Sequence, residues 1–480
     1  MERESMNIPH HWECKTLVEC TSNRNISYGI VQPGQHDDNG IGIIRVNNFE
    51  NGRLNTSDVL KVSPSIEAKF TKTRLNGGEV LLTLVGSTGQ SAVVPSELKG
   101  WNVPRAVAVI RPSEAVSAEW INICLQSSHT KHFLDARANT TVQKTLNLKD
   151  VKDIPIPLPP IVERQRLEDI VVSLEHKITL NRQINQTLEH MAQALFKSWF
   201  VDFDPVVDNA LDAGFFEQNS DLPEALLRRA EQRKAVRQRH DFKPLTAETR
   251  QLFPTAFEEC EEPSLGLGGW VPKGWKNIAI YSLAEFINGA AYKAFEPNLD
   301  KRGLPIIKIA ELKAGVTDQT AFSDKSMPEK YRLTTGDILF SWSGNPDTSI
   351  DTFVWTYGEA WLNQHIFKVT PPDIIGERSF VLIALKSLKP IFAETARNKQ
   401  TTGLGHVTVA DLKRLQIIKP EPNVLAAWDH LVSPYVNQIL ALTLQAQTLA
   451  QLRDTLLPKL ISGELRLSDD GTLASGNTDC

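Results

Sequence analysis

Gly78-Glu79-Val80-Leu81-Leu82 decides the fold, because the same signal for a buried strand returns as Gly336-Asp337-Ile338-Leu339-Phe340. Other matching positions follow in the same order at offsets between 258 and 263 residues. They pair Pro9 and Trp12 with Pro272 and Trp275, Gly40 and Arg45 with Gly303 and Lys308, and Leu148, Asp150 and Ile154 with Val409, Asp411 and Leu415. A solenoid repeat is only about 20–50 residues long, so the chain is predicted to hold a duplicated domain with two similar sites.

Composition is that of a soluble globular protein. The 480 residues are 41% hydrophobic and 23% charged, and the length predicts about two to four domains. No apolar run of about 18 residues predicts a membrane span, and the start from Met1 to Ser5 lacks the apolar stretch of a secretory signal. The five cysteines form no Cys-x-x-Cys pair, which argues against a zinc site and a disulfide framework. We therefore expect a cytoplasmic protein without a metal.

The charge balance limits what either repeat can do alone. The net charge is −5, and residues 1–150 and 270–411 each contain 16 lysines plus arginines against 15 aspartates plus glutamates. An independent, high-affinity DNA binder is expected to be basic. If this chain holds nucleic acid, a partner must supply part of the phosphate neutralisation.

Each repeat follows one plan: a globule, a proline-rich joint and a long helix. Short runs bounded by Gly, Asn and Pro predict strands at 41–46, 80–85, 106–110, 306–309, 338–342 and 366–369. Helices are predicted at 118–138 and 378–397. The joints, at 154–160 and 417–422, should be extended because proline has no amide hydrogen to donate.

A heptad pattern predicts that the two long helices pair along an apolar seam. In the second helix, apolar residues alternate at spacings of four and three from Trp428 to Leu460. In the first, the predicted seam is Leu167, Ile170, Leu174, Ile184, Leu188, Met191 and Leu195, with Lys177 and Asn181 as polar interruptions. Each helix should be about 50 Å long, and Pro434 should kink the second or mark its start. An antiparallel pair is the simplest arrangement, and it can also act as a spacer between globules.

Two segments lack a counterpart in the other half. Residues 205–268 contain a predicted helix, Pro223 to His240, with a basic face made of Arg228, Arg229, Arg233, Lys234, Arg237 and Arg239. Two interpretations of this face stay open, a solvated helix and a contact to phosphate or to a partner. The polar residues 467–480 are predicted to be a disordered tail.

The sequence carries no credible catalytic constellation. It has no Gly-x-x-x-x-Gly-Lys-Ser/Thr phosphate loop and no Asn/Asp-Pro-Pro-Tyr/Phe tetrapeptide of an amino-methyltransferase, which Asp202-Phe203-Asp204-Pro205 does not match. Glu97-x-Lys99 and Glu311-x-Lys313 resemble half of a nuclease motif, but neither has a Pro-Asp partner upstream. Two globules without chemistry, joined by long helices, predict a recognition scaffold.

Several strings resemble one family closely. These are Asp150 to Arg166, Leu180 to Asn185, Ala192 to Pro205, Leu252-Phe253-Pro254 and Leu456 to Leu465. In this order they are similar to the specificity (S) subunit of type I restriction-modification enzymes, and the resemblance covers nearly the whole chain. The segment from 205 to 250 is longer than the family's compact pattern, which leaves open how the first helix connects to the second globule.

The resemblance implies an α+β fold with two duplicated α/β target-recognition domains, two long antiparallel coiled-coil helices and internal pseudo-two-fold symmetry. The implied segments are two recognition domains at 1–155 and 269–418, two spacer helices at 156–204 and 419–466, a central connection at 205–268, and a tail at 467–480.

The resemblance also implies a function without catalysis by this chain. Each globule would bind half of a split, asymmetric site in double-stranded DNA, while the helices set the spacer and dock two modification subunits. Those partners would use S-adenosylmethionine to methylate adenine at N6, and two restriction subunits would use ATP and magnesium. This chain itself would hold no cofactor.

Candidate base-reading residues are polar side chains on loops that differ between the repeats, because such side chains read base edges. In the first globule they are Lys72, Arg74, Ser87, Thr88, Gln90, Arg105, Thr141, Gln143 and Lys144. In the second they are Lys330, Arg332, Trp342, Asn345, Gln364, His365, Lys399, Gln400, Thr401 and Thr402.

A candidate partner surface comprises the helix-end residues Phe196, Trp199, Phe200, Phe203, Leu457 and Leu460. Four aromatics within eight residues exceed what a two-helix seam buries, and an exposed apolar patch usually marks an interface. The alternative interpretation is a local core formed with the central segment.

Two rival functions remain at this point. A self-sufficient nuclease or methyltransferase would need the absent motifs, and a purely structural scaffold would leave no footprint on DNA.

Overall fold

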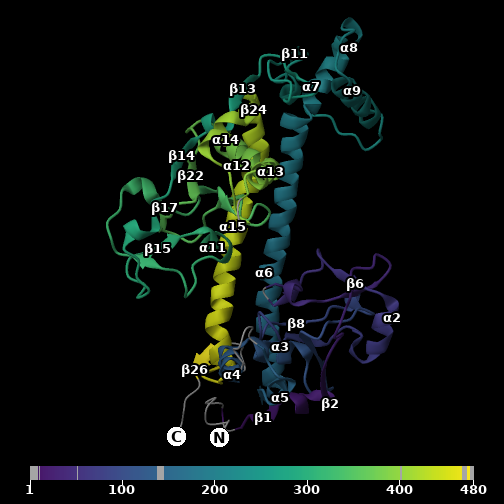
Figure 1. Cartoon of the computed structure of the whole chain (residues 1–480), viewed down its shortest axis with the longest axis vertical. Helices are drawn as coiled ribbons and strands as arrows, with labels where there is room; N and C mark the ends of the chain where they lie inside the picture. The colour runs from purple at the N-terminus through teal and green to yellow at the C-terminus, as the bar shows by residue number, and fades with distance from the viewer. Residues whose placement is uncertain are drawn as a thin grey trace. The chain divides into compact units, whose positions relative to one another are not determined.

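The chain forms two compact units, shown in Figure 1 as a computed structural model that describes residues 9, 11–50, 52–137, 145–400, 403–467 and 473–475. Unit 1 comprises Met1–Thr179 and Ala446–Cys480, and unit 2 comprises Leu180–Gln445. Each unit contains one repeat together with parts of both long helices, so a single repeat in sequence does not make a single unit in space.

In unit 1 the globule is built on a four-stranded antiparallel sheet of order β2-β9-β7-β8. Its strands and helices are β1 (Glu13–Thr16), β2 (Thr21–Tyr28), β3 (Ile41–Ile43), β4 (Phe49–Glu50), β5 (Arg53–Leu54), β6 (Leu60–Val62), α2 (Pro64–Glu67), β7 (Val80–Thr83), β8 (Ser91–Val93), β9 (Val107–Pro112), α3 (Ala118–Gln126), α4 (Ser128–Arg137), α5 (Leu148–Lys152) and β10 (Pro155–Leu158). The fully buried strand β7 pairs with both β8 and β9, which explains why its sequence is a continuous apolar run.

Unit 2 repeats this sheet as β14-β22-β18-β20. Its strands and helices are β11 (Phe257–Glu259), β12 (Trp270–Pro272), β13 (Lys276–Ala279), β14 (Glu285–Asn288), β15 (Leu304–Ile307), α11 (Ile309–Ala314), β16 (Phe322–Ser323), β17 (Arg332–Leu333), β18 (Ile338–Ser341), β19 (Ser343–Gly344), β20 (Asp351–Val354), β21 (Ala360–Leu362), β22 (Ile366–Thr370), α12 (Glu377–Ser387), α13 (Lys389–Arg397), β23 (Gly405–His406), α14 (Val409–Arg414) and β24 (Gln416–Lys419). The prediction of duplicated α/β domains is confirmed.

The predicted single helices of the globules are broken at equivalent places. The first divides into α3 and α4 at Ser127, whose backbone is extended and whose hydroxyl bonds the Cys124 carbonyl at 2.7 Å. The second divides into α12 and α13 at Leu388, and Pro390 lies in the first turn of α13.

The proline-rich joints are strands. β10 pairs antiparallel with β1, and β24 pairs with β13, so each joint is fixed to the start of its own repeat before the long helix begins. Those helices are α6 (Ile161–Phe196), which ends in a π-helical turn (Lys197–Val201), and α15 (Pro422–Ile461). α15 runs on through Pro434, so the prediction that Pro434 marks the helix start is wrong.

Each globule is closed by the far end of the other repeat's helix. Leu457, Leu460 and Ile461 of α15 belong to the core of unit 1, which also contains Trp12. The residues at the equivalent positions, Phe196, Trp199 and Phe200, belong to the core of unit 2 with Trp275.

The predicted partner surface is therefore wrong. Phe196, Trp199, Phe200 and Phe203 are 1–3% exposed and pack on Trp428, Phe380, Phe253 and Trp275 with ring centroids about 5–6 Å apart. Leu457 and Leu460 are 7% and 2% exposed. The surplus of aromatics is buried by the globule and by the central segment, as the alternative interpretation held, rather than by another protein.

In each unit the two long helices pack antiparallel. In unit 2, Asn181 donates to Gln445 at 2.8 Å and Asn185 to Thr443 at 2.9 Å, and Arg453 pairs with Glu175 in unit 1. The second predicted seam holds, since Trp428, Val432, Leu442, Ala446 and Leu460 are buried.

The first seam is partly rotated from the predicted one: Leu167, which was predicted in it, is 2% exposed, but alternate positions are shifted by one residue. Its buried residues include Val171, Ile178, Asn181 and Ala192, whereas Lys177, Ile184 and Met191 are exposed. The buried Asn181 was predicted correctly as a polar residue in the seam.

The central segment is a helical subdomain of unit 2 made of α7 (Asp204–Asp212), α8 (Phe215–Gln218), α9 (Glu224–Arg237) and α10 (Ala247–Arg250). The cations of α9 meet carboxylates at matched spacing: Arg229 pairs with Asp204, Arg233 with Asp208 at 2.5 Å and Arg237 with Asp212 at 2.6 Å. The interpretation as a solvated face is thus wrong for these three arginines, because they pair with α7, and the contact to phosphate or to a partner stays a prediction. Arg228, Lys234 and Arg239 are exposed and pair with nearby acidic residues.

After α15 the chain forms a hairpin of β25 (Leu465–Leu467) and β26 (Leu473–Ser475). The strand β26 departs from the prediction of a disordered tail for 467–480.

Candidate nucleic-acid interface

The two units share one hydrogen-bonded frame at the end of the central strand. In unit 1 the Leu84 amide donates to the Ala106 carbonyl at 2.7 Å, and the Leu146 amide donates to the Leu84 carbonyl at 2.8 Å. In unit 2 the Trp342 amide donates to His365 at 3.2 Å, and Val407 donates to Trp342 at 2.8 Å. Leu84 and Trp342 therefore occupy equivalent places in the frame.

A second pair of bonds ties the first strand of each sheet to the same place. The Arg105 amide donates to the Ile30 carbonyl at 2.7 Å, and the Gln364 amide donates to Ala290 at 2.8 Å. Tyr28 pairs with Ala108 just as Asn288 pairs with Phe367. By this register the side chains Tyr28, Leu84, Arg105, Ala106 and Thr145 in unit 1 correspond to Asn288, Trp342, Gln364, His365 and His406 in unit 2.

In unit 1 the small side chains of the frame leave a cavity of about 560 Å³. Leu84, Ala106 and Thr145 line it, together with the exposed Tyr28 and Arg105. Arg105 was predicted as a DNA contact, and its position at the mouth of a cavity is compatible with that role. Tyr28 was missed, because a tyrosine at the end of a strand is more often a packing residue.

The turn between β7 and β8 carries three other predicted residues. Ser87 and Gln90 are exposed, and Thr88 is half-buried. The buried Thr83 holds the turn, because its hydroxyl donates to the Ser87 carbonyl at 2.5 Å and accepts from the Gln90 amide at 3.0 Å. The backbone is therefore fixed while the side chains of Ser87 and Gln90 face solvent.

Lys72 and Arg74 lie elsewhere. Arg111, near the far end of β9 from Arg105, donates to both of their carbonyl oxygens at 2.9 Å, and six residues of strand span about 20 Å. Arg74 is also paired with the buried Glu67, and this hydrogen-bonded pairing lowers the pKa of the Glu67 carboxyl. The structure thus favours a structural role for Arg74.

In unit 2 aromatic rings occupy the frame. The Trp342 ring lies 5.1 Å from His365 and 5.8 Å from His406, and its indole nitrogen donates to the Asn288 side chain at 3.0 Å. We call Asn288, Trp342, His365 and His406 the ring cluster. Trp342 and His365 were predicted as DNA contacts, whereas Asn288 and His406 were missed because they are remote in sequence from both.

Some of the other predicted residues of unit 2 are exposed, and some form ion pairs or hydrogen bonds within the globule. Asn345 is exposed, and its side-chain oxygen accepts from the Asp347 and Thr348 amides at 3.0 and 3.1 Å. Gln400 is exposed, and Gln364 is half-buried. Arg332 is paired with Glu359 and Glu329, while Lys330 is exposed beside the Tyr331 ring.

Lys399 is tied to the globule. Its ammonium group lies 2.6 Å from the carboxylate of Asp411, which is 2% exposed. Burial acts to raise the pKa of Asp411, but the hydrogen bonds from Lys399 and Thr408 outweigh it and hold that pKa below its ordinary value. Thr141, Gln143, Lys144, Thr401 and Thr402 lie outside the described residues.

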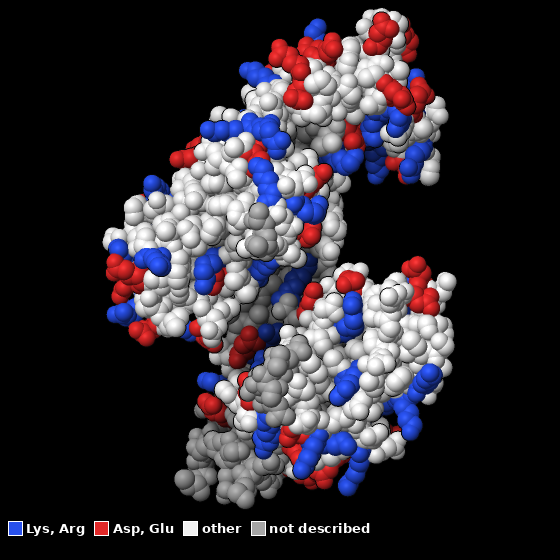
Figure 2. All heavy atoms as spheres, in the orientation of Figure 1, with Lys and Arg blue, Asp and Glu red and all other residues white. Residues whose placement is uncertain are grey.

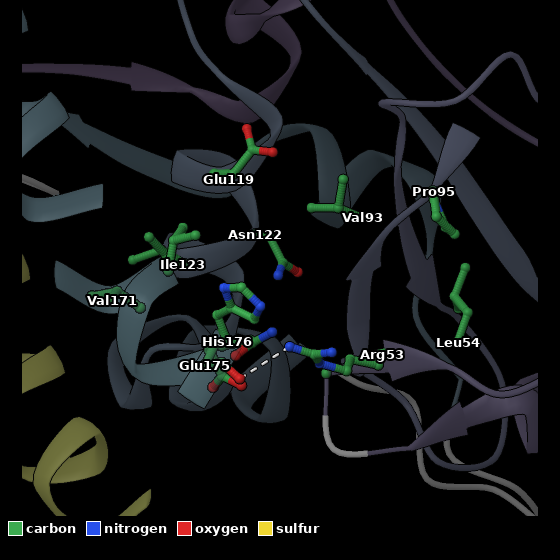
Figure 3. A pocket seen from close by; sticks show the side chains of 13 residues that line it. Arg53, Leu54, Val93, Pro95, Glu119, Asn122, Ile123, Val171, Glu175 and His176 are labelled. Carbon is green, nitrogen blue, oxygen red and sulfur yellow. Dashed lines mark hydrogen bonds between the residues drawn. The ribbon is translucent and has the colours of Figure 1, made fainter. Parts of the chain in front are cut away.

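A further cavity of about 390 Å³ lies between the sheet edge, α3 and α6 of unit 1 (Figure 3). Val93, Ile123 and Val171 give it an apolar wall, and Arg53 donates to the Glu175 carbonyl at 3.0 Å across it. Among the described residues, none of the predicted DNA contacts lines this cavity.

Charge is mixed on the face drawn in Figure 2, where acidic side chains lie among the lysines and arginines of both units. Within the described part of the chain, no group of three or more histidine, cysteine or acidic side chains could hold a metal ion. The described helices include none long and apolar enough to cross a membrane.

The family model and the sequence relatives of this chain agree on one family. The family model described as "Type I restriction modification DNA specificity domain" matches residues 30–190 and 272–427. The chain is 27% identical over 413 residues to the type I restriction enzyme HindI specificity subunit of Haemophilus influenzae, covering 82% of this chain and 88% of the relative. It is 20% identical to the MjaIX specificity subunit of Methanocaldococcus jannaschii, with 82% and 78% covered. The crystal structure of an S subunit from M. genitalium has 13% identity and a TM-score of 0.44, with 95% of this chain and 98% of that chain covered.

Proposed function

Because the chain belongs to the type I restriction-modification DNA specificity family, we propose that each of its two globules reads one half of a split, asymmetric DNA target. One observation carries this proposal. The two units use the same backbone frame, yet the side chains on it differ completely: Tyr28, Leu84 and Thr145 are replaced by Asn288, Trp342 and His406. Two similar frames with unlike side chains are suited to reading unlike sequences.

The long helices would set the number of unread bases between the halves. The 36 residues of α6 span about 54 Å at 1.5 Å per residue, which is about one and a half turns of B-DNA. Within unit 2 the two helices are joined by the hydrogen bond from Asn181 to Gln445, which supports their role as a spacer.

The chemistry would belong to partner subunits. Two modification subunits would dock on the helices and methylate an adenine in each half-site at N6, using S-adenosylmethionine. Two restriction subunits would add ATP- and magnesium-dependent cleavage. The balanced charge of both repeats supports a shared DNA interface, because partners must then supply part of the positive field. A cytoplasmic location, beside the DNA, follows from this proposal.

The test is to co-express the chain with the modification subunit and to map N6-methyladenine across the host genome by single-molecule sequencing. We expect one split motif, methylated once on each strand and lost on deletion of the chain. Replacing residues 1–155 by the first globule of another specificity subunit should change one half of the motif only. A folded complex that methylates no motif dependent on this chain would favour a non-DNA scaffold. Metal-dependent cleavage by the chain alone would favour a stand-alone nuclease.

A further inference from the structure

We propose that the ring cluster is the base-reading element of the second globule, in which His365 and His406 each present a ring N–H donor to acceptor atoms on a base edge. This inference rests on the proposed function and adds to it the residues and the chemistry of one half-site.

The first argument is position. The ring cluster occupies the same place in the frame as the open cavity of unit 1, where the exposed Tyr28 and Arg105 stand. Unit 2 has the rings of Trp342, His365 and His406 where unit 1 has Leu84, Ala106 and Thr145. The same location thus carries two different surfaces, which is the property that a pair of unlike half-sites requires.

The second argument is strain. His365 has φ of +76°, a left-handed conformation that is uncommon for a residue other than glycine. Its carbonyl accepts from Trp342, and the preceding Gln364 amide bonds Ala290, so the backbone is held from two sides. Residues in such strained conformations persist only where the surrounding structure holds them, and they cluster at functional sites.

The third argument concerns which ring nitrogen carries the proton. Both imidazoles are partly exposed, but the Nδ1 atom of each is buried and makes no hydrogen bond within the described part of the chain. A proton on Nδ1 would be a buried donor without an acceptor, which costs about 1–3 kcal/mol. With the proton on Nε2, the buried Nδ1 is instead an acceptor without a donor, but the N–H donor then lies on the ring nitrogen that is not buried, where a ligand or water can pair with it. Burial, aided by the nearby His406, also lowers the pKa of His365 and so favours the neutral ring.

Two Nε2–H donors fit base edges that offer acceptors. In the major groove guanine presents two adjacent acceptors, N7 and O6, whereas adenine presents an acceptor next to a donor that a second N–H would oppose. The structure therefore assigns a guanine to the half-site of the second globule. Trp342, anchored by Asn288 at 3.0 Å, acts as a positioning residue that holds both imidazoles.

A metal site is the main rival use of two adjacent histidines. A structural site needs about four ligands, and the described residues offer no group of three.

The test uses the full complex with its modification subunit. His365→Asn keeps a residue that tolerates the left-handed backbone, and His406→Ala removes the second ring. His240→Ala, an exposed histidine of the central segment, is the matched control. Single-molecule sequencing then reports the methylated fraction for every one-base variant of the motif.

We expect the first half of the motif to be unchanged in both variants. Discrimination at one or two positions of the second half, including a guanine, should fall by about 5- to 150-fold. The control should keep the parent motif at every position. An unchanged second half, or a uniform loss of methylation in a folded complex, overturns the inference but leaves the proposed function standing. A parent chain that directs no motif overturns the proposed function itself.

Discussion

The end of α6 packs into the core of unit 2, and a substitution there can test whether its aromatic residues stabilise that core or bind a partner. Phe200 is 3% exposed, and its ring lies 5.1 Å from both Trp428 and Phe380 and 6.0 Å from Trp275. Phe200→Ala should therefore destabilise unit 2 rather than weaken a contact with another subunit.

The magnitude follows from the buried area. Removing about 150 Å² of buried apolar surface at about 25 cal/mol per Å² costs about 4 kcal/mol, within the range of about 3–5 kcal/mol for buried Phe→Ala changes. For a unit of this size, about 2–4 °C per kcal/mol predicts that its melting temperature falls by about 8–16 °C.

The assay is differential scanning calorimetry of the full complex, combined with hydrogen exchange resolved by peptide. Amides of β18 and β22 should exchange faster in Phe200→Ala, while those of β7 and β9 should not change. Ile461→Ala is the matched variant, because Ile461 holds the equivalent place in unit 1 and is 4% exposed. It should loosen β7 and β9 instead, at a cost of about 2–5 kcal/mol. A loss below about 1 kcal/mol for Phe200→Ala, with a weakened complex, would refute the reasoning.

Three further predictions concern charged groups. Asp208→Asn should destabilise the central segment by up to about 3 kcal/mol, because Arg233, with a side chain 12% exposed, would lose its closest carboxylate and keep only the 3.6 Å contact with Asp204. Glu224→Gln, at an exposed pair with Arg228, should change stability by under about 0.5 kcal/mol, and peptide-resolved hydrogen exchange of α7 and α9 compares the two. Asp411 has a folded-state pKa below its unfolded value, so its contribution to stability is present above the unfolded pKa and is lost as pH falls through the folded pKa. Asp411→Asn should flatten that part of the acid-unfolding curve, and an unchanged slope between about pH 4 and pH 2 would count against it. Arg105→Ala should weaken DNA binding by the complex and reduce the salt slope by about one if this exposed arginine meets a phosphate, whereas Arg74→Ala should leave the slope unchanged.

Local signals were sufficient for the elements and for the duplication. The apolar run from Val80 to Leu82 and its counterpart from Ile338 to Phe340 each form a central strand, because a strand buried on both faces needs apolar residues throughout. The long helices followed from the heptad spacing, although the first seam was partly rotated, since periodicity gives a stripe but does not decide which of two neighbouring stripes is buried. The predicted basic face shows the same limit: the spacing of Arg229, Arg233 and Arg237 was visible, but the matching spacing of Asp204, Asp208 and Asp212 acquired meaning only when α7 lay beside α9.

By itself, the sequence determined that the chain is a duplicated recognition protein with two globules and two long helices, because those features depend on local periodicity and on motifs that match a known family. Only the tertiary structure decided which side chains are buried and which come together at the surface. It placed Phe196, Trp199 and Phe200 inside a core, because the end of the first repeat's long helix packs against the globule of the second repeat. It also gathered Asn288, Trp342, His365 and His406 into one cluster from segments up to 118 residues apart, since sheet register and backbone hydrogen bonds, not spacing along the chain, set which side chains meet.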